Sequence, residues 1–334
     1  MAYDNIRLEK GLYTTGKSFT GALEELDPSD NYLGTELEGL DAYQRQLKRF
    51  DIKVSGSGSD CVGKFFQTSD SAALFPEYVS RAVRQGMEQD NILDKIVTTT
   101  TDIDALDYRG ITSDINNDAL LPADIGEGAF IPEAHIKLKE TLTPLKKRGR
   151  MLVASYEAVK FQKLDLFTVV LAQIGNAIAA AQAEDALTVI KESEEVKYIN
   201  KPSTSTKYSY TDLLGLWEGM GDYRLTTLVC NTKELKDLLN ITEFRDAAAG
   251  LNFHSTGQMI TPLGAEVVKS NHIDLNGTIL GMDNRYALEK VQAGGILTDF
   301  DKLIDRQLER AAITAIAGFS LIDSNACAIL GPAH

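Results

Sequence analysis

The sequence predicts an α+β protein, because helical and strand-like segments follow one another without any internal repeat. One segment, Leu164–Ile190, is a long apolar run with helical spacing. A second, HIKLKETLTPL, alternates apolar and polar residues as a strand does. Beyond Ser209, short helical and strand-like stretches mix. The chain of 334 residues exceeds the usual size of one domain, so we expect two lobes.

Composition and charge exclude several classes of protein. Apolar residues make up 43% and charged residues 25% of the chain, which is typical of a globular protein. The net charge is −14, from 34 basic and 48 acidic residues. Tight binding to nucleic acid of any sequence needs basic residues that neutralise phosphates, so we exclude that function. Cys61, Cys230 and Cys327 form no CxxC pair, which favours three reduced thiols in a cytoplasmic protein.

The first 60 residues are polar and irregular, with one predicted helix over Leu37–Phe50. They begin with MAYDNIRLEKG, which carries charges where a secretory signal needs an apolar segment. They end in SGSGSD, which has the composition of a flexible linker. We then expect a helix that is capped by Asp70 or Ser71 and runs through ALFPEYVSRAV, followed by a strand over Ile96–Ile103.

Residues 111–150 are rich in turn formers and predict a long hairpin. In HIKLKETLTPL, one face of the strand carries apolar residues and the other is cationic. The apolar face comprises Ile136, Leu138 and Leu142, and the polar face comprises Lys137, Lys139 and Thr141. KKRGR, Lys146–Arg150, follows as the densest basic cluster of an acidic chain.

The long helix has two apolar stripes, one for each half. The first stripe comprises Phe167, Val170, Leu171, Ile174, Ala177, Ile178 and Ala181. Asp185 falls in the middle of this stripe and must end it. A second stripe, rotated by about 140°, comprises Ala183, Ala186, Leu187, Val189 and Ile190. The helix is therefore predicted to pack against two different partners. Gln173 and Asn176 interrupt its most apolar part, so we do not expect a membrane span, which needs about 20 consecutive apolar residues.

A polar connector, Lys201–Ser209, is the predicted boundary between the lobes. We expect a helix over Tyr210–Met220, a buried strand over Leu225–Asn231 and a capped helix from Thr232. Residues 262–295 alternate short strands with Gly and Asn turns. The end of the chain predicts two long strands, one on either side of Gly318 and Phe319.

One segment has the spacing of a phosphate-binding loop. GSDCVGKF, Gly58–Phe65, satisfies G-x-x-x-x-G-K and follows the strand-like FDIKV. Phe65, however, replaces the Ser or Thr that would hold Mg²⁺, and FFQTSDS does not open a helix directly. We interpret the segment as a Gly/Ser linker that happens to contain Gly-Lys.

The other candidate site residues have structural interpretations. Cys230 in LTTLVCN is predicted to be a small core residue rather than a nucleophile. Glu184 and Asp185 diverge by about 100° on a helix and cannot share a proton. None of the four histidines has metal-ligand spacing with a cysteine: His135, His254, His272 and His334. We therefore predict no catalytic, cofactor-binding or metal-binding residues, and no enzyme.

The order of these elements resembles the major capsid proteins of tailed bacteriophages, whose fold is named after the Hong Kong 97 phage. The resemblance covers about residues 70–330. It rests on ALFPEYVSRAV, GEGAFIPEAHIKLKETLTPLKKRGRMLVASYEAV, the Ala-rich long helix and the terminal AAITAIAGFSLIDSNACAIL. It implies an α+β capsid fold with an N-terminal arm, an extended hairpin loop, a peripheral domain with a long spine helix, and an axial domain.

The resemblance also implies a domain layout. The arm and the extended loop would reach onto neighbouring subunits, and Gly250–Met259 would point to the five- or six-fold axis. The implied parts are the N-terminal arm (1–75), the first part of the peripheral domain (76–110), the extended loop (111–151), the peripheral domain with the spine helix (152–202), the axial domain (203–299) and the closing strands of the peripheral domain (300–334).

The implied function is structural. Such a chain self-assembles as hexamers and pentamers into the icosahedral capsid of a tailed phage or prophage, assembled in the cytoplasm of the bacterial host and found in the virion. The shell encloses double-stranded DNA, which its inner face contacts non-specifically. The other implied partners are a separate scaffolding protein, a portal and a decoration protein, with no membrane.

Two alternatives remain open at the level of sequence. One is an encapsulin-like compartment of the same fold, and the other is a nucleotide-binding enzyme that uses Gly58–Lys64. We do not predict the Lys–Asn crosslink of some family members, because the required residues have no matching positions here. The basic side chains of the hairpin are expected to meet acidic surface on the next subunit or, alternatively, to stay solvated. They are Lys137, Lys139, Lys146, Lys147, Arg148 and Arg150.

Overall fold

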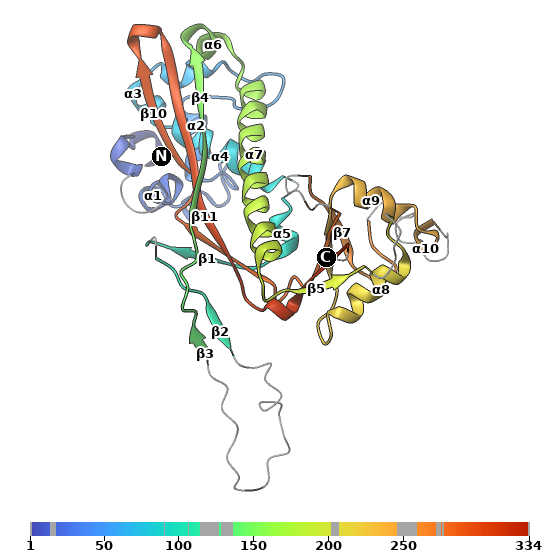
Figure 1. The fold of residues 1–334 in the computed structure, drawn as a ribbon. Coiled ribbons are helices and arrows are strands. Elements are labelled where there is room, and N and C mark those ends of the chain that lie inside the picture. Colours follow the sequence, from blue (N-terminus) through green and yellow to red (C-terminus); the bar gives the residue numbers. More distant parts are fainter. Residues whose placement is uncertain are drawn as a thin grey trace. The chain divides into compact units, whose positions relative to one another are not determined.

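The chain divides into two compact units, each built from three separate segments (Figure 1). Unit 1 comprises Met1–Asp90, Gly149–Ile178 and Ile296–Ala315, and unit 2 comprises Asn91–Arg148, Ala179–Gly295 and Ile316–His334. The computed structural model describes residues 2–13, 18–89, 91–105, 107–113, 127, 136–201, 207–245, 259–271, 275 and 277–332. The predicted boundary Lys201–Ser209 lies inside unit 2, because the strand before it and the helix after it pack together.

Unit 1 begins with short helices, most of which contribute side chains to one core. These are the 3₁₀ helices Ala2–Asn5, Lys10–Tyr13, Ser29–Tyr32 and Val62–Phe66 and the α-helices α1 (Phe19–Leu26), α2 (Ala42–Arg49), α3 (Ser69–Ala72) and α4 (Phe75–Glu88). The expectation of an irregular N-terminal region was wrong: Leu8, Phe19, Leu23 and Leu47 are all buried in this core. The sequence hides the pattern because each short helix contributes only a few apolar residues between charged ones.

The predicted helix from Asp70 or Ser71 is divided in two. Thr68 caps α3, where its side chain accepts a hydrogen bond from the backbone of Ser71. The chain turns at Ala73, and α4 starts at Phe75 with a proline in its first turn, where the missing N–H costs nothing. The predicted helix Leu37–Phe50 is shorter, because α2 begins after its N-cap Asp41.

The remainder of unit 1 supplies strands and the first half of the long helix. Strand β10 (Leu297–Leu303) pairs antiparallel with the first part of β11 (Leu308–Leu321), from Leu297 opposite Thr314 to Leu303 opposite Leu308. Strand β4 (Lys146–Ser155) pairs with β11 and leads into α6 (Tyr156–Phe161), which is capped by the Ser155 hydroxyl.

The spine helix α7 (Leu164–Glu192) serves two cores, as its sequence predicts. In its first half Leu164, Phe167, Leu171 and Ile178 are buried in the core of unit 1. In its second half Ala183, Ala186, Leu187 and Ile190 are buried in a core of unit 2. The predicted first stripe was too wide, because Val170 and Ala177 are exposed.

Length and composition alone make α7 a candidate membrane span, with a mean hydropathy of 1.6 over its most apolar window. Its buried residues nevertheless belong to the two protein cores. Asp185 is also ion-paired with two basic side chains of the same unit. We therefore describe α7 as a core helix, as the sequence predicts.

Two sheets organise unit 2. In the first, β1 (Val97–Ile103) runs parallel to β9 (Leu288–Ala293), which pairs antiparallel with the second part of β11. In the second, the strand order is β5-β12-β8-β6-β7. Its strands are β5 (Lys197–Asn200), β6 (Thr227–Cys230), β7 (Glu266–Lys269), β8 (Ile279–Met282) and β12 (Cys327–Gly331). The helices of the unit besides α7 are α5 (Leu93–Ile96), α8 (Tyr210–Gly219), α9 (Thr232–Leu239) and α10 (Thr242–Arg245) among the described residues.

The predicted break at Gly318 and Phe319 is absent, since β11 runs through both residues. Gly318 is required for close packing instead. A Cβ atom at this position would lie 2.6 Å from the carbonyl oxygen of Pro144, so only glycine lets the hairpin segment approach the strand. Sequence alone does not separate this role from that of a turn glycine.

Candidate assembly surface

The stem of the predicted hairpin is formed by β2 (Ile111–Ser113) and β3 (Ile136–Leu138), which pair antiparallel with Ile111 opposite Leu138. Directly opposed residues of an antiparallel pair share one face of the ribbon. Ile111 is 55% exposed and Leu138 is 67% exposed, and Leu142 further along the chain is 50% exposed. Ile111 and Leu138 therefore form an apolar face of the stem that the described residues leave open to solvent, and Leu142 is exposed beyond the end of β3.

A buried carboxylate anchors the base of this hairpin, where Thr101, Tyr108 and Ser320 come together. We call this region the hairpin root. Glu289 on β9 accepts hydrogen bonds from the hydroxyls of Thr101 and Tyr108, both at 2.6 Å, and of Ser320, at 3.3 Å. The pKa of Tyr108 is raised, first because its hydroxyl donates to Glu289 and second because of burial. The Glu289 side chain thus links strand β1, the segment before β2 and strand β11. Sequence reasoning missed Glu289, whose only signal was a lone acidic residue in the strand ALEKV.

Backbone contacts extend this root along the hairpin. The backbone N–H of Lys139 donates to the Gly110 carbonyl at 2.9 Å, and that of Thr143 donates to the Tyr108 carbonyl at 2.8 Å. The Lys139 ammonium donates to the carbonyl of Leu321, at the end of β11. The Lys139 ammonium is therefore hydrogen-bonded within its own subunit.

Two more of the predicted interface cations form an internal ion pair. Asp185 on α7 accepts from Lys146 at 2.7 Å and from Arg148 at 2.7 and 3.0 Å. Burial alone would raise the pKa of Asp185, but the hydrogen bonds from Arg148 and Lys146 outweigh it and lower the pKa. Lys146 and Arg148 thus clamp the start of β4 to the spine helix. The expected contact of these two side chains with a neighbour stays a prediction. Lys147 and Arg150 are exposed.

A second apolar surface lies on unit 1. Leu166, Val169 and Val170 on α7 are 57%, 52% and 39% exposed, and Phe161 on α6 is 70% exposed. Residues three and four apart lie on one side of a helix, so the three α7 residues form one exposed stripe. Surface apolar patches of this kind mark interaction sites more often than isolated apolar residues do.

The segment Gly58–Phe65, which has the spacing of a phosphate-binding loop, does not adopt that structure. Val62–Phe66 is a 3₁₀ helix, and Phe65 is fully buried in the core of unit 1. The Lys64 ammonium lies 3.1 Å from Asp60 and 3.2 Å from Asp51, so two carboxylates hold the charge that a phosphate would need. This geometry opposes the interpretation of Gly58–Lys64 as a nucleotide site.

No constellation for catalysis or metal binding is found among the described residues. None of them form a group of three or more His, Cys, Asp or Glu suited to a metal. The three cysteines are free thiols, and burial raises the pKa of Cys230 and of Cys327 to about 12, which disfavours the reactive thiolate. All four histidines and residues 250–258 of the predicted axial loop Gly250–Met259 lie outside the described residues.

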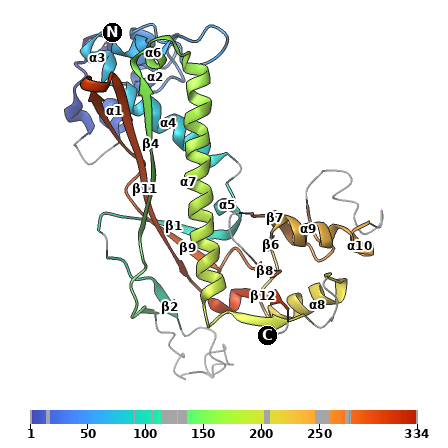
Figure 2. The same cartoon turned by 45° about the horizontal axis from the view of Figure 1, so that its top comes forward.

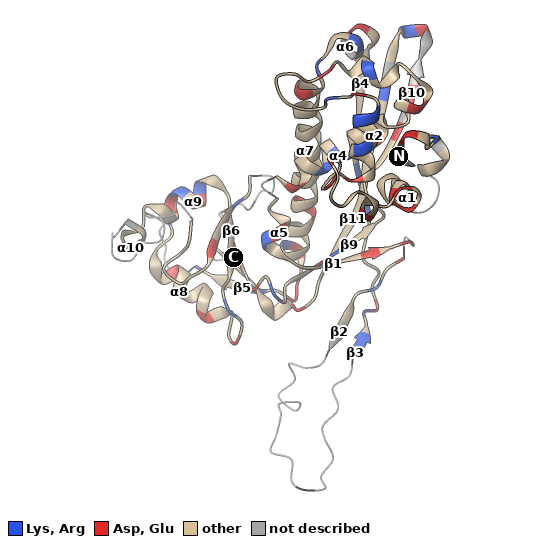
Figure 3. Cartoon of the chain, turned by 180° about the vertical axis from the view of Figure 1, so that it is seen from behind, with Lys and Arg blue, Asp and Glu red and all other residues tan. Residues whose placement is uncertain are grey.

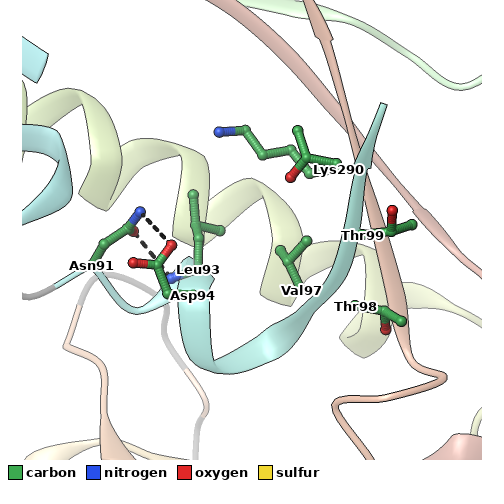
Figure 4. Close-up of a pocket in the computed structure, with 8 residues that line it drawn as sticks. Asn91, Leu93, Asp94, Val97, Thr98, Thr99 and Lys290 are labelled. Atoms are coloured by element: carbon green, nitrogen blue, oxygen red, sulfur yellow. Dashed lines mark hydrogen bonds between the residues drawn. The ribbon is translucent and has the colours of Figure 1, made fainter. Parts of the chain in front are cut away.

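Figure 4 shows a shallow pocket beside β1 and β9, with Asn91, Asp94 and Lys290 on its wall. Its volume of about 190 Å³ is smaller than the usual ligand pocket of about 300–1,000 Å³. Asn91 donates to Asp94 at 3.2 Å, and burial lowers the pKa of Lys290. The charges of Asp94 and Asp102 oppose this lowering of the Lys290 pKa.

Comparisons with known proteins address the identity of the chain. The family model for phage capsid proteins matches residues 139–318, more than half of the chain. No curated protein sequence matches it. The matched region includes β4, the spine helix and most of unit 2.

Solved structures share the fold at low sequence identity. A virus-like particle from Pyrococcus furiosus has 15% identity and a TM-score of 0.52, with 76% of this chain and 98% of that chain covered. The capsid of an empty GTA particle has 14% identity and a TM-score of 0.54, covering 73% and 90%. The capsid of a native GTA particle gives 14% and 0.54, covering 73% and 91%. The chain is thus a shell-forming structural protein with the α+β fold of the Hong Kong 97 type, and it belongs to the phage capsid protein family.

Proposed function

We propose that this chain assembles as hexamers and pentamers into the icosahedral shell of a tailed phage, which encloses double-stranded DNA. The observation that carries the proposal is the exposed apolar pair Ile111 and Leu138 on the hairpin stem, with Leu142 exposed further along the chain. Burying one Leu or Ile side chain is worth about 1.5–3 kcal/mol. A second subunit that covers this face would gain that stabilisation, and membership of a capsid family supports this occupant.

The proposal depends on a hairpin that is held in a fixed direction. Glu289 ties Thr101, Tyr108 and Ser320 together at its root, and the Asp185 ion pairs hold the start of β4. A pre-oriented stem loses less conformational entropy when a neighbour covers it. Lys147 and Arg150 remain the cations best placed to select an acidic surface on that neighbour.

The other parts of the proposal follow from the family. The N-terminal arm would be residues 1–75, although its described residues pack on unit 1. Leu26 and Leu33, 55% and 69% exposed, are the apolar positions through which it would touch a neighbour. Residues 203–299 would form the axial domain. The acidic chain would meet packaged DNA only non-specifically. Scaffolding, portal and decoration proteins, and assembly in the host cytoplasm, belong to the same proposal.

The test is a pair of hairpin variants. Leu138→Asp places a charge on the exposed apolar face, so we expect normal subunit folding and loss of closed shells by electron microscopy. Glu140→Gln, at an exposed polar position of the same segment, is the control and should assemble normally. Shells of unchanged yield from Leu138→Asp would show that this face is not covered by a neighbour.

An encapsulin-like compartment of the same fold is the competing function. The content of the particle separates the two. Particles from phage-producing cells should contain double-stranded DNA that nucleases cannot reach until the shell is opened. Shells that form in uninfected cells and enclose an enzyme instead of DNA would favour the compartment.

A further inference from the structure

Two helices cover one face of the second sheet of unit 2 near its opposite edges (Figures 1 and 2). Helix α8 packs against β5 and β12, and β5 is an edge strand. Helix α9 starts beside the other edge strand, β7. Its first residue, Thr232, donates through its N–H and its hydroxyl to the side-chain oxygen of Asn271, just after β7, at 3.0 and 2.7 Å. Both helices bury leucines in the same core.

The outward side of α8 is apolar and acidic. Trp217, the single tryptophan of the chain, is 53% exposed, and Leu214 three residues earlier is 38% exposed. Glu218 and Asp222 beside them are exposed. An exposed tryptophan is costly in water, and tryptophan is among the residues most enriched at the energetic centres of protein interfaces. The exposed Trp217 therefore favours a protein–protein contact on this side of α8 over a surface that only meets water.

The outward side of α9 is basic (Figure 3). Lys233 and Lys236 are exposed, and Lys269 at the end of β7 is exposed as well. Among the described residues, the ion pairs involve none of these three lysines. Lysine stems cover apolar surface while their ammonium groups attract carboxylates and the face of an indole ring. The two helices thus present complementary surfaces at opposite edges of one sheet.

We infer that the outer side of α8 in one subunit docks on the outer side of α9 in the next subunit of the same ring. Trp217 is then covered by the stems of Lys233 and Lys236, which face Glu218 and Asp222. A contact between two different patches repeats head to tail, and it closes into a ring when the rotation between neighbours divides a full turn. A two-fold contact of α8 with α8 would instead oppose like charges. The inference rests on the proposed function, since it names the contact inside its hexamers and pentamers.

The first test uses the single tryptophan of the full chain. The Trp217 emission maximum should shift to shorter wavelength when isolated subunits assemble, because the indole leaves water. An emission maximum that stays at the same wavelength in assembled shells would overturn the inference. Wild-type subunits that never assemble would overturn the proposed function itself, so the two failures are distinguishable.

The second test is a charge exchange across the contact. Glu218→Lys and Lys236→Glu should each lower the yield of shells at least tenfold, and the double variant should recover most of it. Lys48→Glu, an exposed lysine on α2, is the matched control and should assemble normally. Urea denaturation should give the same midpoint for all variants, as these side chains are exposed. Single variants that assemble like Lys48→Glu, or a double variant no better than the single ones, would contradict the contact.

Discussion

Arg45 and Asp27 form the most deeply buried ion pair among the described residues, with both side chains inaccessible to solvent. The Arg45 Nε atom donates to the Asp27 carboxylate at 2.8 Å. Its Nη1 atom donates to the Ser29 hydroxyl and the Leu40 carbonyl, and its Nη2 atom donates to the Asp27 carbonyl. Tyr32 donates to the same carboxylate at 2.6 Å. Every charge of the pair is therefore compensated, and the cluster links α1 to α2.

Removing one member of this pair should destabilise unit 1 strongly. We expect Asp27→Ala to lower the free energy of unfolding by about 3–5 kcal/mol, because it leaves a buried guanidinium without its counter-charge. Arg7→Ala breaks the exposed pair with Glu9, where the two side chains are 83% and 57% exposed. That control should cost less than about 1 kcal/mol. Equal losses in urea denaturation would refute the difference.

The ion pairs of Asp185 should make the free energy of unfolding depend on pH. Its pKa is lowered below 3.8 by Arg148 and Lys146 against the opposing effect of burial. The ion pair therefore stabilises the fold at pH values above the ordinary pKa of an aspartate. This stabilisation is lost as the pH falls through the lower pKa that Asp185 has in the folded state. Asp185→Asn should cost about 1–2 kcal/mol at neutral pH, since both cations are partly exposed.

The measurement is the free energy of unfolding from neutral pH into the acidic range. The difference between wild type and Asp185→Asn should shrink as the carboxylate becomes protonated. Glu194→Gln, at an exposed acidic position beyond the helix, should show no such difference. A gap between wild type and Asp185→Asn that is constant with pH would contradict the role of the ion pair.

At the scale of elements, the packing of α4 against α7 depends on two glycines. A Cβ atom at Gly86 would lie 2.0 Å from the carbonyl oxygen of Ala172, and one at Gly175 would lie 2.0 Å from that of Val83. The helices approach so closely that neither position has room for a methyl group. Both glycines are in helix interiors, where glycine is otherwise unfavourable.

Gly86→Ala should therefore lower the free energy of unfolding by about 1–3 kcal/mol or more, because α4 must move away from α7. Gly215→Ala is the matched control in α8, since a Cβ atom there meets nothing within 4 Å. It should stabilise the subunit by up to about 1 kcal/mol through its better helix propensity. Thermal or urea denaturation of the two variants should show opposite signs, and equal signs would contradict the close packing.

Sequence reasoning succeeded for elements with a long or repeated pattern. The two stripes of α7, the helices at Tyr210 and Thr232 and the buried strand at Thr227 all follow local periodicity. Prediction from sequence failed where one residue type can have two structural roles, or where an element is too short to show a pattern. Gly318 was expected at a turn but allows a close approach, and the short N-terminal helices show too few apolar residues each to reveal a core.

At the scale of the whole molecule, the fold could be predicted better than the interaction surface. Element order was sufficient to recognise the capsid family, which a family model and shared folds support. Of the cations on the hairpin, however, Lys146 and Arg148 pair with Asp185 and Lys139 donates to Leu321. These are contacts between residues far apart in sequence, and no local charge pattern distinguishes them from contacts with another subunit.

The central claim is that the apolar face of the hairpin stem joins one subunit to the next in a closed shell. The most direct measurement is a cryo-electron microscopy map of particles assembled from the full chain, with a scaffolding partner supplied where the chain alone forms none. The account predicts closed shells with five- and six-fold rings, in which a neighbouring subunit covers Ile111, Leu138 and Leu142. Shells in which these three side chains face solvent, or small oligomers under both conditions, would contradict it.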